Sequence, residues 1–553
     1  MKQPGLLQAG QPEIDLLYNR LAVKSEDFHT DRFHLKHLCA LPGRFADFSL
    51  AANDFFLDYS RQRLDNEALA LLFEAAEATG ALEKFREMTR GNLVNTTEKR
   101  AALHMATRAS ESSASKQPLT IDGHDVNAGI NRVNAEIRDF VENVHTGRLT
   151  GTSGSPFSDA VVVGIGGSYL GCEFVYHAMG PSMDRRIALH FLPNVDIDDF
   201  AGIISRVNPE KTLWIIISKS YTTTETMANL NQVLAFLNAE GLSPKDHVVT
   251  VTAKGSPGDD PENPVLASFH MFDFIGGRYS VSSAVGGVPL GLAYGWEGFR
   301  RFLDGCRCMD THALSAPVHE NIPLTAALIS IWNKHFLGYP AQAIIPYASR
   351  LSRLAPHIQQ LYMESIGKSV SFSGKELRHP AGSIIFGEPG TNAQHSFFQL
   401  AHQGPAFPID FIGVAVPGFS GPQAQSKGVT NHQELWANLL AQARALALGR
   451  DNEDPARRFK GNRPCSIIML NDLEPESIGQ LLAFYEARTI FEGFILGINP
   501  FDQFGVELGK VMAGDLRREI AARNQDTDHD FSHLDAPDQF YLDMVFKKNI
   551  PGK

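Results

Sequence analysis

The sequence has few cysteines, and only five of its 553 residues are of this type. An odd number of scattered cysteines is typical of thiols that stay reduced, so a disulfide scaffold is excluded. Two of them stand two positions apart without a second pair at zinc-ligand spacing, which favours small apolar residues of a helix over a metal site. The five are Cys39, Cys172, Cys306, Cys308 and Cys465.

Long apolar runs are also missing. No segment approaches the roughly 18 uninterrupted apolar residues of a membrane span. The first residues, Met-Lys-Gln-Pro-Gly, are followed by mixed polar residues and lack the apolar core of a secretory signal. The sequence therefore predicts a cytoplasmic protein without a membrane partner.

Positive charge is in deficit, with 50 basic against 62 acidic residues and a formal net charge of -12. Because such a field repels phosphate backbones, we predict no nucleic-acid partner. A small anion can still bind where a pocket of amide groups and a few cations overrides the distant field. The remaining composition, 43% hydrophobic and 20% charged, is typical of a globular chain with two to four domains at roughly 100 to 200 residues each.

The distribution of apolar residues predicts an α/β fold. The first 120 or so residues are expected to be mainly helical, with one helix over 65–90, and the polar segment 109–123 marks a boundary. A helix with an apolar residue every three or four positions follows over 130–144. Short apolar runs rich in β-branched residues come next, in two groups: 160–165, 187–192, 213–217 and 248–251, and later 343–346, 384–386, 411–416 and 465–470.

Continuous rather than alternating apolar strands indicate parallel sheets covered on both faces by helices. We therefore predict two three-layer α/β/α sandwich subdomains with mainly parallel sheets, a helical N-terminal region and a C-terminal arm. The expected bounds are 1–120 for the N-terminal region, which packs on the large subdomain, 121–296 for the first, small subdomain, 297–514 for the second, large subdomain, and 515–553 for the arm.

Ligands of such sheets bind at the carboxyl ends of the strands, where two turns contain unusual residues. The first turn carries Gly164, Gly166 and Gly167 directly after a strand, where backbone amides can approach an anion closely. A dinucleotide-binding fingerprint would require glycine at Tyr169, so that fingerprint fails. A tight packing turn remains the alternative explanation of these glycines.

The second turn concentrates hydroxyl groups at the expected start of a helix. It reads Ser-Lys-Ser-Tyr-Thr-Thr-Thr-Glu-Thr over 218–226, with five serine or threonine hydroxyls up to Thr224. One such residue would cap a helix, but five exceed what a cap requires. Hydroxyl donors at the positive end of a helix predict binding of a phosphate monoester.

Three further segments carry candidate acid, base and oxyanion groups. Arg278, in a glycine turn, presents planar donors suited to an oxyanion. Gln360 and Glu364 lie four apart on one face of an expected helix. His395 is expected in the first turn of another helix, whose positive end would favour the neutral imidazole.

One more segment carries candidate polar residues. It covers 499–510 and reads Asn-Pro-Phe-Asp-Gln-Phe-Gly-Val-Glu-Leu-Gly-Lys. If it is helical from Gln503, then Gln503, Glu507 and Lys510 share one face. Taken singly, each of these polar residues is better explained by a solvated surface group or a satisfied ion pair, but the set as a whole is harder to explain in that way.

In order and spacing, these segments resemble the glucose-6-phosphate isomerase (phosphoglucose isomerase) family, in its long form. The resemblance spans 164–510, although the last signature is one spacer residue shorter here. Ile366 stands where relatives often carry asparagine and Tyr169 where many carry aspartate. The segments are Gly-Ile-Gly-Gly-Ser, Ser-Lys-x-x-Thr-Thr, Gly-Gly-Arg-Tyr-Ser, Met-Glu-Ser-x-Gly-Lys, Gly-Glu-Pro-Gly-Thr-Asn-x-Gln-His and Phe-Asp-Gln-x-Gly-Val-Glu-x-x-Lys.

The resemblance implies a role for each candidate residue. Glu364 would move a proton between the first and second carbons of the sugar, Arg278 would stabilise the enediolate, and His395 and Lys510 would assist ring opening. Gln360 and Gln503 would position the substrate. The phosphate would be held by Ser168, Ser218, Ser220 and Thr223, with the backbone around Gly167 and Lys219.

The same resemblance implies a sugar-isomerase type of fold and reversible isomerisation of glucose 6-phosphate and fructose 6-phosphate, a step of glycolysis and gluconeogenesis. The route would pass through a cis-enediol(ate) without metal or cofactor, in a homodimer whose His395 reaches the neighbouring subunit's site. Two alternatives remain: a non-catalytic sugar-phosphate sensor of the same fold, and a nucleotide-dependent dehydrogenase, which the missing fingerprint disfavours.

Overall fold

A computed structural model describes residues 12–109, 119–377 and 380–550 of the chain. Residues up to Phe501 form one compact unit, and those from Asp502 onward form a second. Most of the polar segment predicted as a boundary, 109–123, lies outside the described residues.

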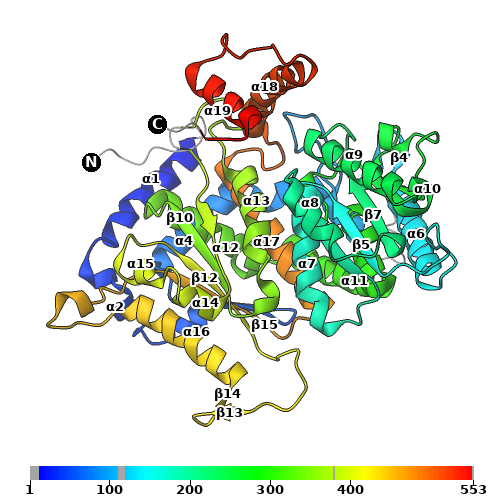
Figure 1. Ribbon diagram of the computed structural model, residues 1–553. Coiled ribbons are helices and arrows are strands. Elements are labelled where there is room, and N and C mark those ends of the chain that lie inside the picture. Colours follow the sequence, from blue (N-terminus) through cyan, green and yellow to red (C-terminus); the bar gives the residue numbers. More distant parts are fainter. Residues whose placement is uncertain (1–11, 110–118, 378–379, 551–553) are drawn as a thin grey trace. The chain divides into compact units, whose positions relative to one another are not determined.

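The first sheet of the large unit is entirely parallel, with the order β6-β5-β7-β8-β9. Its strands are β5 (Asp159–Val163), β6 (Ala188–Leu192), β7 (Thr212–Ile217), β8 (Val248–Ala253) and β9 (Ala267–Met271). Alternate residues of β5 and β7 point to opposite faces of the sheet, and each face packs into its own hydrophobic core. One core is shared with α8 (Ile197–Ile204) and α9 (Thr224–Ala239). The other is shared with α6 (Val126–His145), α7 (Leu170–Met179) and α11 (Ala284–Ser315). The sheet is thus covered on both faces (Figure 1).

The second sheet has the order β1-β2-β15-β12-β10-β11 and is parallel from β15 to β11. Its strands are β1 (Ser49–Ala52), β2 (Phe55–Asp58), β10 (Ala341–Pro346), β11 (Ile384–Phe386), β12 (Ile409–Val414) and β15 (Cys465–Leu470). One face packs on α14 (Gly390–Gln394), α15 (Phe398–Gln403) and α16 (Asn431–Leu448), the other on α12 (Ile322–Ile331), α13 (Leu354–Ile366) and α17 (Pro475–Leu496). The predicted pair of mainly parallel, three-layer sandwiches is confirmed.

Helix α6 shows how local sequence produces these elements. The side chain of Asp125 caps the helix by accepting a 3.0 Å hydrogen bond from the backbone nitrogen of Ala128. The apolar stripe that predicted this helix is buried along its whole length. The helix ends at His145, and Gly147 follows in the left-handed region with φ 71°.

Strands β1 and β2 were not predicted. They form a hairpin from the N-terminal region, and β2 adds antiparallel to β15 of the second sheet. Asn53 and Asp54 turn the hairpin with φ values of 54° and 62°, the backbone that a two-residue hairpin turn requires. Strand β9 was also missed, because Ala-Ser-Phe-His-Met alternates apolar and polar residues at the edge of its sheet.

The single helix predicted over 65–90 is wrong. Two helices occupy this segment, α4 (Asn66–Ala78) and α5 (Ala81–Thr89). Gly80 separates them with φ 64°, a left-handed backbone that glycine adopts without steric cost and that no helix interior contains.

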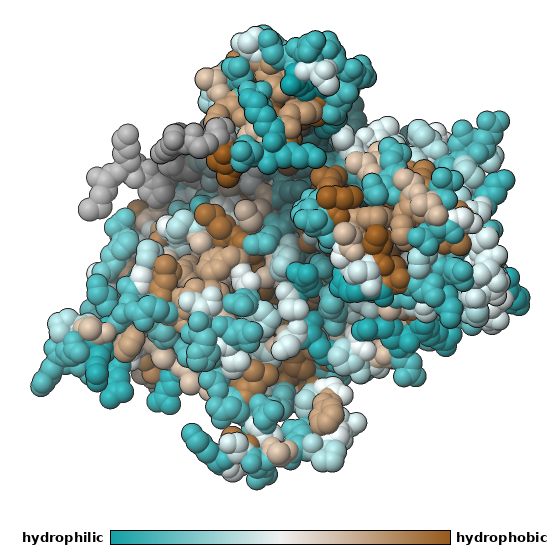
Figure 2. Space-filling model, in the orientation of Figure 1, coloured by the Kyte–Doolittle hydropathy of each residue, from teal (hydrophilic) through white to brown (hydrophobic). Residues whose placement is uncertain are grey.

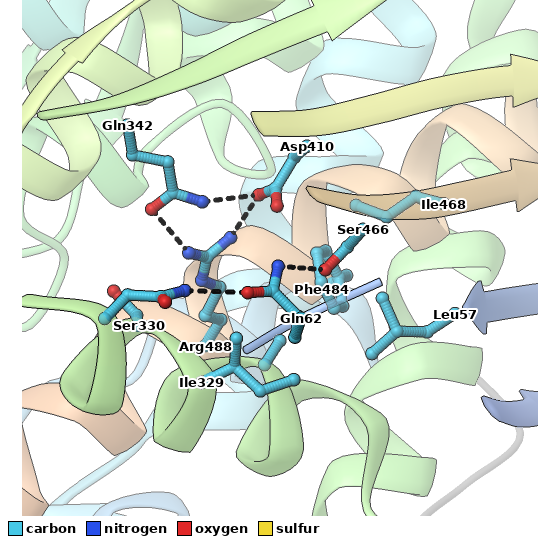
Figure 3. Close-up of a pocket in the computed structure, with 12 residues that line it drawn as sticks. Leu57, Gln62, Ile329, Ser330, Gln342, Asp410, Ser466, Ile468, Phe484 and Arg488 are labelled. Carbon is cyan, nitrogen blue, oxygen red and sulfur yellow. Dashed lines mark hydrogen bonds and ion pairs between the residues drawn. The ribbon is translucent and has the colours of Figure 1, made fainter. Parts of the chain in front are cut away.

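A buried polar cluster joins the second sheet to α17 (Figure 3). Arg488 donates to Asp410 at 2.6 Å and to Gln342 at 2.8 Å, while Gln62 donates to Ser466 at 2.9 Å. The cavity between these side chains has a volume of about 10 Å³, enough for about one water molecule. The cluster therefore orients α17 on the strands. The cavity within it is too small to bind a metabolite.

The second unit contains two helices, α18 (Glu507–Gln525) and α19 (Ala536–Lys547). His529 and His533 contact the carboxylate of Glu519 at 2.9 Å and 3.0 Å. Phe531, in the segment that connects the two helices, is buried, and its ring lies 5.8 Å from that of Phe546 in α19.

A helix that crosses a bilayer must be long enough and apolar enough to span its hydrocarbon core. None in the described part of the chain is long and apolar enough to cross a membrane. The face drawn in Figure 2 is mostly hydrophilic, with separate hydrophobic patches rather than a continuous band.

Candidate active site

The two turns singled out by the sequence follow neighbouring strands. Strands β5 and β7 pair in parallel, with Val163 opposite Ile216. A Cβ atom built on Gly164 would lie 3.1 Å from the carbonyl oxygen of Ile217 and 2.9 Å from the Cβ atom of Ser168. The turn containing Ser168 and the turn containing Ser218 therefore begin side by side at one edge of the sheet.

Hydrogen bonds fix the hydroxyl groups of the second turn, both to one another and to backbone nitrogen atoms. Ser218, which is buried, donates to the hydroxyl of Thr223 at 3.3 Å and accepts from the nitrogen of Tyr221 at 3.1 Å. Ser220 accepts from the hydroxyl of Thr222 at 2.7 Å. Since α9 begins at Thr224, these hydroxyls surround the positive end of a helix, a position that complements an anion.

Lys219 connects this turn to the segment that leads into the Arg278 turn. Its ammonium group donates to the carbonyl oxygens of Asp273 at 3.0 Å and Ile275 at 3.4 Å, and its own carbonyl accepts from Ala253 at 3.0 Å. Burial lowers the pKa of Lys219, and the carboxylate of Asp273, 3.3 Å away, opposes that shift. Lys219 is therefore fixed both by its side-chain ammonium group and by its backbone carbonyl.

The glycine loop and the Arg278 turn are in direct contact. A Cβ atom on Gly167 would lie 2.2 Å from the carbonyl carbon of Gly277, and the hydroxyl of Ser280 donates to the carbonyl of Gly167 at 3.3 Å. Glycine at position 167 is therefore required by a close approach of two backbones. This contact supports the packing-turn explanation of the glycine loop, and anion binding by the amides of the loop stays a prediction.

Arg278, Gln360 and Glu364 meet beside this loop. Arg278, only 3% exposed, donates to one carboxylate oxygen of Glu364 at 3.3 Å, and Gln360 donates to the other at 3.3 Å. Gln360 also lies against the glycine loop, since its amide nitrogen is 3.0 Å from the Cβ position of Gly166. The side chain of Glu364 remains 28% exposed, so a ligand can reach its carboxylate.

The helical position predicted for His395 is wrong. Helix α14 spans only Gly390–Gln394, and His395 is the residue that ends it, with its nitrogen bonded to the carbonyl of Asn392 at 2.9 Å. The argument from the positive end of a helix therefore does not apply. His395 is exposed, and no contact joins it to Arg278 or Glu364 within residues 12–109, 119–377 and 380–550.

The condition under which Gln503, Glu507 and Lys510 would share one helical face is not met. A 3-10 turn occupies Phe504–Val506 and α18 begins only at Glu507, so Gln503 lies outside the helix while Lys510 lies within it. Gln503 and Lys510 belong to the second unit, which is described by itself. Their participation in a site with Glu364 stays a prediction.

Two groups that contact Arg278 were missed by the sequence analysis. The hydroxyl of Ser365 and the carbonyl oxygen of Pro500 each accept a 2.7 Å hydrogen bond from its guanidinium. Ser365 directly follows Glu364 within the Met-Glu-Ser segment, which was a usable signal. A backbone carbonyl 222 positions away has no signal in the sequence.

These side chains can perform a defined kind of chemistry. A half-buried carboxylate beside a buried guanidinium can accept a proton while the cation stabilises the resulting oxyanion, and the hydroxyl turn can hold an anion nearby. Among the residues described, no group of three or more His, Cys, Asp or Glu side chains could hold a metal ion.

The fold and the site define the class of protein as an α/β enzyme that transfers protons on a small anionic substrate. Comparison with known proteins gives the family: the chain belongs to the phosphoglucose isomerase family, whose model matches residues 58–535.

Named relatives agree with this assignment. The chain is 58% identical over 536 residues to the glucose-6-phosphate isomerase of Desulfosudis oleivorans, covering 96% of this chain and 97% of that one. It is 43% identical to the cytosolic glucose-6-phosphate isomerase 2A of Clarkia lewisii, covering 94% and 93%. The crystal structure of a glucose-6-phosphate isomerase from Chlamydia trachomatis superimposes with a TM-score of 0.85 at 36% identity, covering 96% and 98%.

The contact between the glycine loop and the Arg278 turn can be tested by adding one methyl group. We expect Gly167→Ala to destabilise the protein by about 1 to 3 kcal/mol, because the added Cβ atom overlaps the backbone of Gly277. The measurement is the melting temperature by scanning fluorimetry.

Gly202→Ala is the matched control. Gly202 lies in α8, and a Cβ atom there would meet open space among the described residues, so alanine should leave the melting temperature unchanged or raise it. If Gly167→Ala melts at or above the wild-type temperature, the two backbones are not in contact.

Proposed function

We propose that this protein catalyses the reversible isomerisation of glucose 6-phosphate and fructose 6-phosphate, a step of glycolysis and gluconeogenesis. The observation that supports this most directly is the carboxylate of Glu364, held at both oxygens by Gln360 and Arg278 beside the glycine loop. The relatives at 58% and 43% identity carry the name of this activity.

Glu364 is the base in this proposal. Exchanging an aldose for a ketose requires removal of a weakly acidic proton beside a carbonyl and its return to the adjacent carbon. A carboxylate on a rigid helix such as α13 can reach both carbons, and a positioned base contributes about 10²- to 10⁴-fold in rate. Arg278 stabilises the oxygen charge of the cis-enediol(ate), which contributes a further roughly 10²- to 10³-fold.

The phosphate of the substrate is remote from the bonds that change, so its binding energy serves orientation. We assign it to the positive end of α9 and the neighbouring glycine loop, where hydroxyls and backbone amides converge. The proposed phosphate-binding groups are Ser168, Ser218, Ser220 and Thr223 and the backbone of Gly167 and Lys219.

Ring opening needs a proton moved from a hydroxyl to the ring oxygen. We assign this step to His395 and Lys510, because imidazole exchanges protons near neutral pH and an ammonium group supplies a second donor. Gln503 and Gln360 orient the sugar in this scheme. The proposed reaction requires no metal or redox cofactor, since it breaks the C–O bond of the ring as the proton moves, otherwise only transfers protons, and needs no external oxidant or reductant.

We further propose a homodimer in which His395 completes the site of the other subunit. His395 is exposed and separate from Arg278 and Glu364 in its own described chain, and Leu400 on the adjacent α15 is 49% exposed. A two-fold interface over this surface would bury an apolar side chain and bring each imidazole to the opposite site.

The substrate is a soluble hexose phosphate, and we propose the cytoplasm as the location, in line with the cytosolic name of the Clarkia relative. A non-catalytic sensor would need the phosphate turn but not a carboxylate held by Arg278 and Gln360, so this alternative lacks support. A coupled assay that follows glucose 6-phosphate formation from fructose 6-phosphate in the presence of a chelator tests activity and metal independence together.

The role of Glu364 is tested by Glu364→Gln. The amide preserves shape but cannot accept the proton, so we expect kcat to fall by about 10²-fold or more with KM changed little. The measurement is the coupled assay, with Glu376→Gln on the same subdomain as the control that should keep wild-type turnover. Wild-type kcat in Glu364→Gln would remove this carboxylate from the mechanism.

The phosphate site is tested by the double variant Ser218→Ala with Thr223→Ala. Each hydroxyl bond to a charged phosphate contributes about 1.5 to 3 kcal/mol, so KM for fructose 6-phosphate should rise at least about tenfold. Ser243→Ala, which removes a helix-capping hydroxyl elsewhere beside the same sheet, should leave KM unchanged. An unchanged KM in the double variant would locate the phosphate elsewhere.

The shared site is tested with a mixed dimer of one Glu364→Gln subunit and one His395→Ala subunit, isolated with two different tags. If His395 acts across the interface, one of the two sites contains both wild-type residues, and about half of the wild-type activity returns. If His395 acts within its own subunit, both sites stay defective and the mixed dimer is as slow as its parents.

A further inference from the structure

The guanidinium of Arg278 is held on three sides by the protein. Its Nε atom donates to the hydroxyl of Ser365 at 2.7 Å, one terminal nitrogen donates to the carbonyl of Pro500 at 2.7 Å, and the other donates to Glu364 at 3.3 Å. The two short bonds go to groups that take no part in the chemistry. The longer bond goes to the carboxylate that does.

The hydroxyl of Tyr279 connects the two acceptors of Arg278, Ser365 and Pro500, so that the four groups form a closed ring of hydrogen bonds. Its hydroxyl lies 3.0 Å from the hydroxyl of Ser365 and donates to the carbonyl of Pro500 at 3.3 Å. One consistent set of protons satisfies every member: Arg278 donates to Ser365, Ser365 to Tyr279, and both Tyr279 and Arg278 to Pro500.

Burial makes this ring stiff. Ser365 is fully buried and Tyr279 is 1% exposed, so neither hydroxyl can exchange its partner for bulk water. Burial raises the pKa of Tyr279 to about 12, which keeps the phenol protonated and able to donate. The rigid helix α13 carries Ser365 next to Glu364, so the group that orients Arg278 and the base move together.

From this geometry, and on the basis of the function proposed above, we propose that Ser365 is a positioning residue. Its hydroxyl fixes the plane of the Arg278 guanidinium so that one edge is offered to the oxyanion of the substrate instead of pairing fully with Glu364.

Removal of that hydroxyl has a defined consequence. The Nε–H group of Arg278 would lose the Ser365 acceptor, and the guanidinium would rotate toward Glu364 and pair with both carboxylate oxygens. A bidentate pair occupies the lone pairs that must accept the proton and withdraws the donor from the oxyanion. The turn that binds the phosphate is built from other residues and stays intact.

The test compares Ser365→Ala and Ser365→Cys in the coupled assay with fructose 6-phosphate. Both remove the hydroxyl, while cysteine keeps the shape and is only a weak acceptor. We expect kcat to fall about 100-fold in both variants with KM within about twofold of wild type, because the change misaligns the reacting groups and not the anchor. Ser466→Ala is the control and keeps wild-type kcat, because Ser466 is also a buried serine but accepts from Gln62, away from Arg278.

Tyr279→Phe provides a second, independent variant in case position 365 does not tolerate change. It removes one hydroxyl of the ring and keeps the packing of the aromatic ring, so kcat should fall about 3- to 10-fold with KM unchanged. Wild-type kcat in Ser365→Cys or in Tyr279→Phe overturns the proposal, as does a rise in KM that accounts for the whole loss. Absence of isomerase activity in the wild-type protein would instead reject the proposed function itself.

Discussion

The ion pair between Arg278 and Glu364 is the interaction on which the site depends. At 3.3 Å, with the arginine buried and the carboxylate partly exposed, it keeps one charge rigid and the other accessible. A buried guanidinium is stable only when its donors are satisfied, and Ser365 and Pro500 meet that requirement at 2.7 Å each. The loop after α17 therefore holds Arg278 in place together with α13, the helix that carries Glu364.

The fold supplies this pair from two separate sandwiches of the large unit. The turns at Gly167, Ser218 and Arg278 follow elements of the first sheet, whereas α13, with Gln360 and Glu364, packs on the second. Contact between the backbones of Gly167 and Gly277 joins two of these turns, and the amide of Gln360 against Gly166 joins them to α13. The groups proposed for anion binding and for proton transfer thus lie on rigid elements that meet at one edge of a sheet.

Much of the fold could be predicted because its causes are local. Continuous apolar runs rich in β-branched residues identified four strands of each sheet, and the apolar stripe of α6 identified that helix, which ends at His145 shortly before Gly147. Errors arose in the bounds of helices. Gly80 divides one predicted helix into two, and α14 ends at Gln394, so that His395 follows the helix instead of lying in its first turn. The hairpin of β1 and β2 escaped notice because its apolar residues become a strand only when β15 lies beside them.

The sequence by itself determined the residue types, the turns that carry them and the family, because hydrophobic period, glycine placement and ordered segments are properties of neighbouring residues. Only the tertiary structure decided which of these residues touch. Arg278 meets Glu364 from 86 positions away and Pro500 from 222, and one of those contacts uses a backbone carbonyl that every residue possesses. Packing of α7 and α11 from the first sandwich against α13 and α17 from the second brings such atoms together, and no local pattern encodes the distance between them.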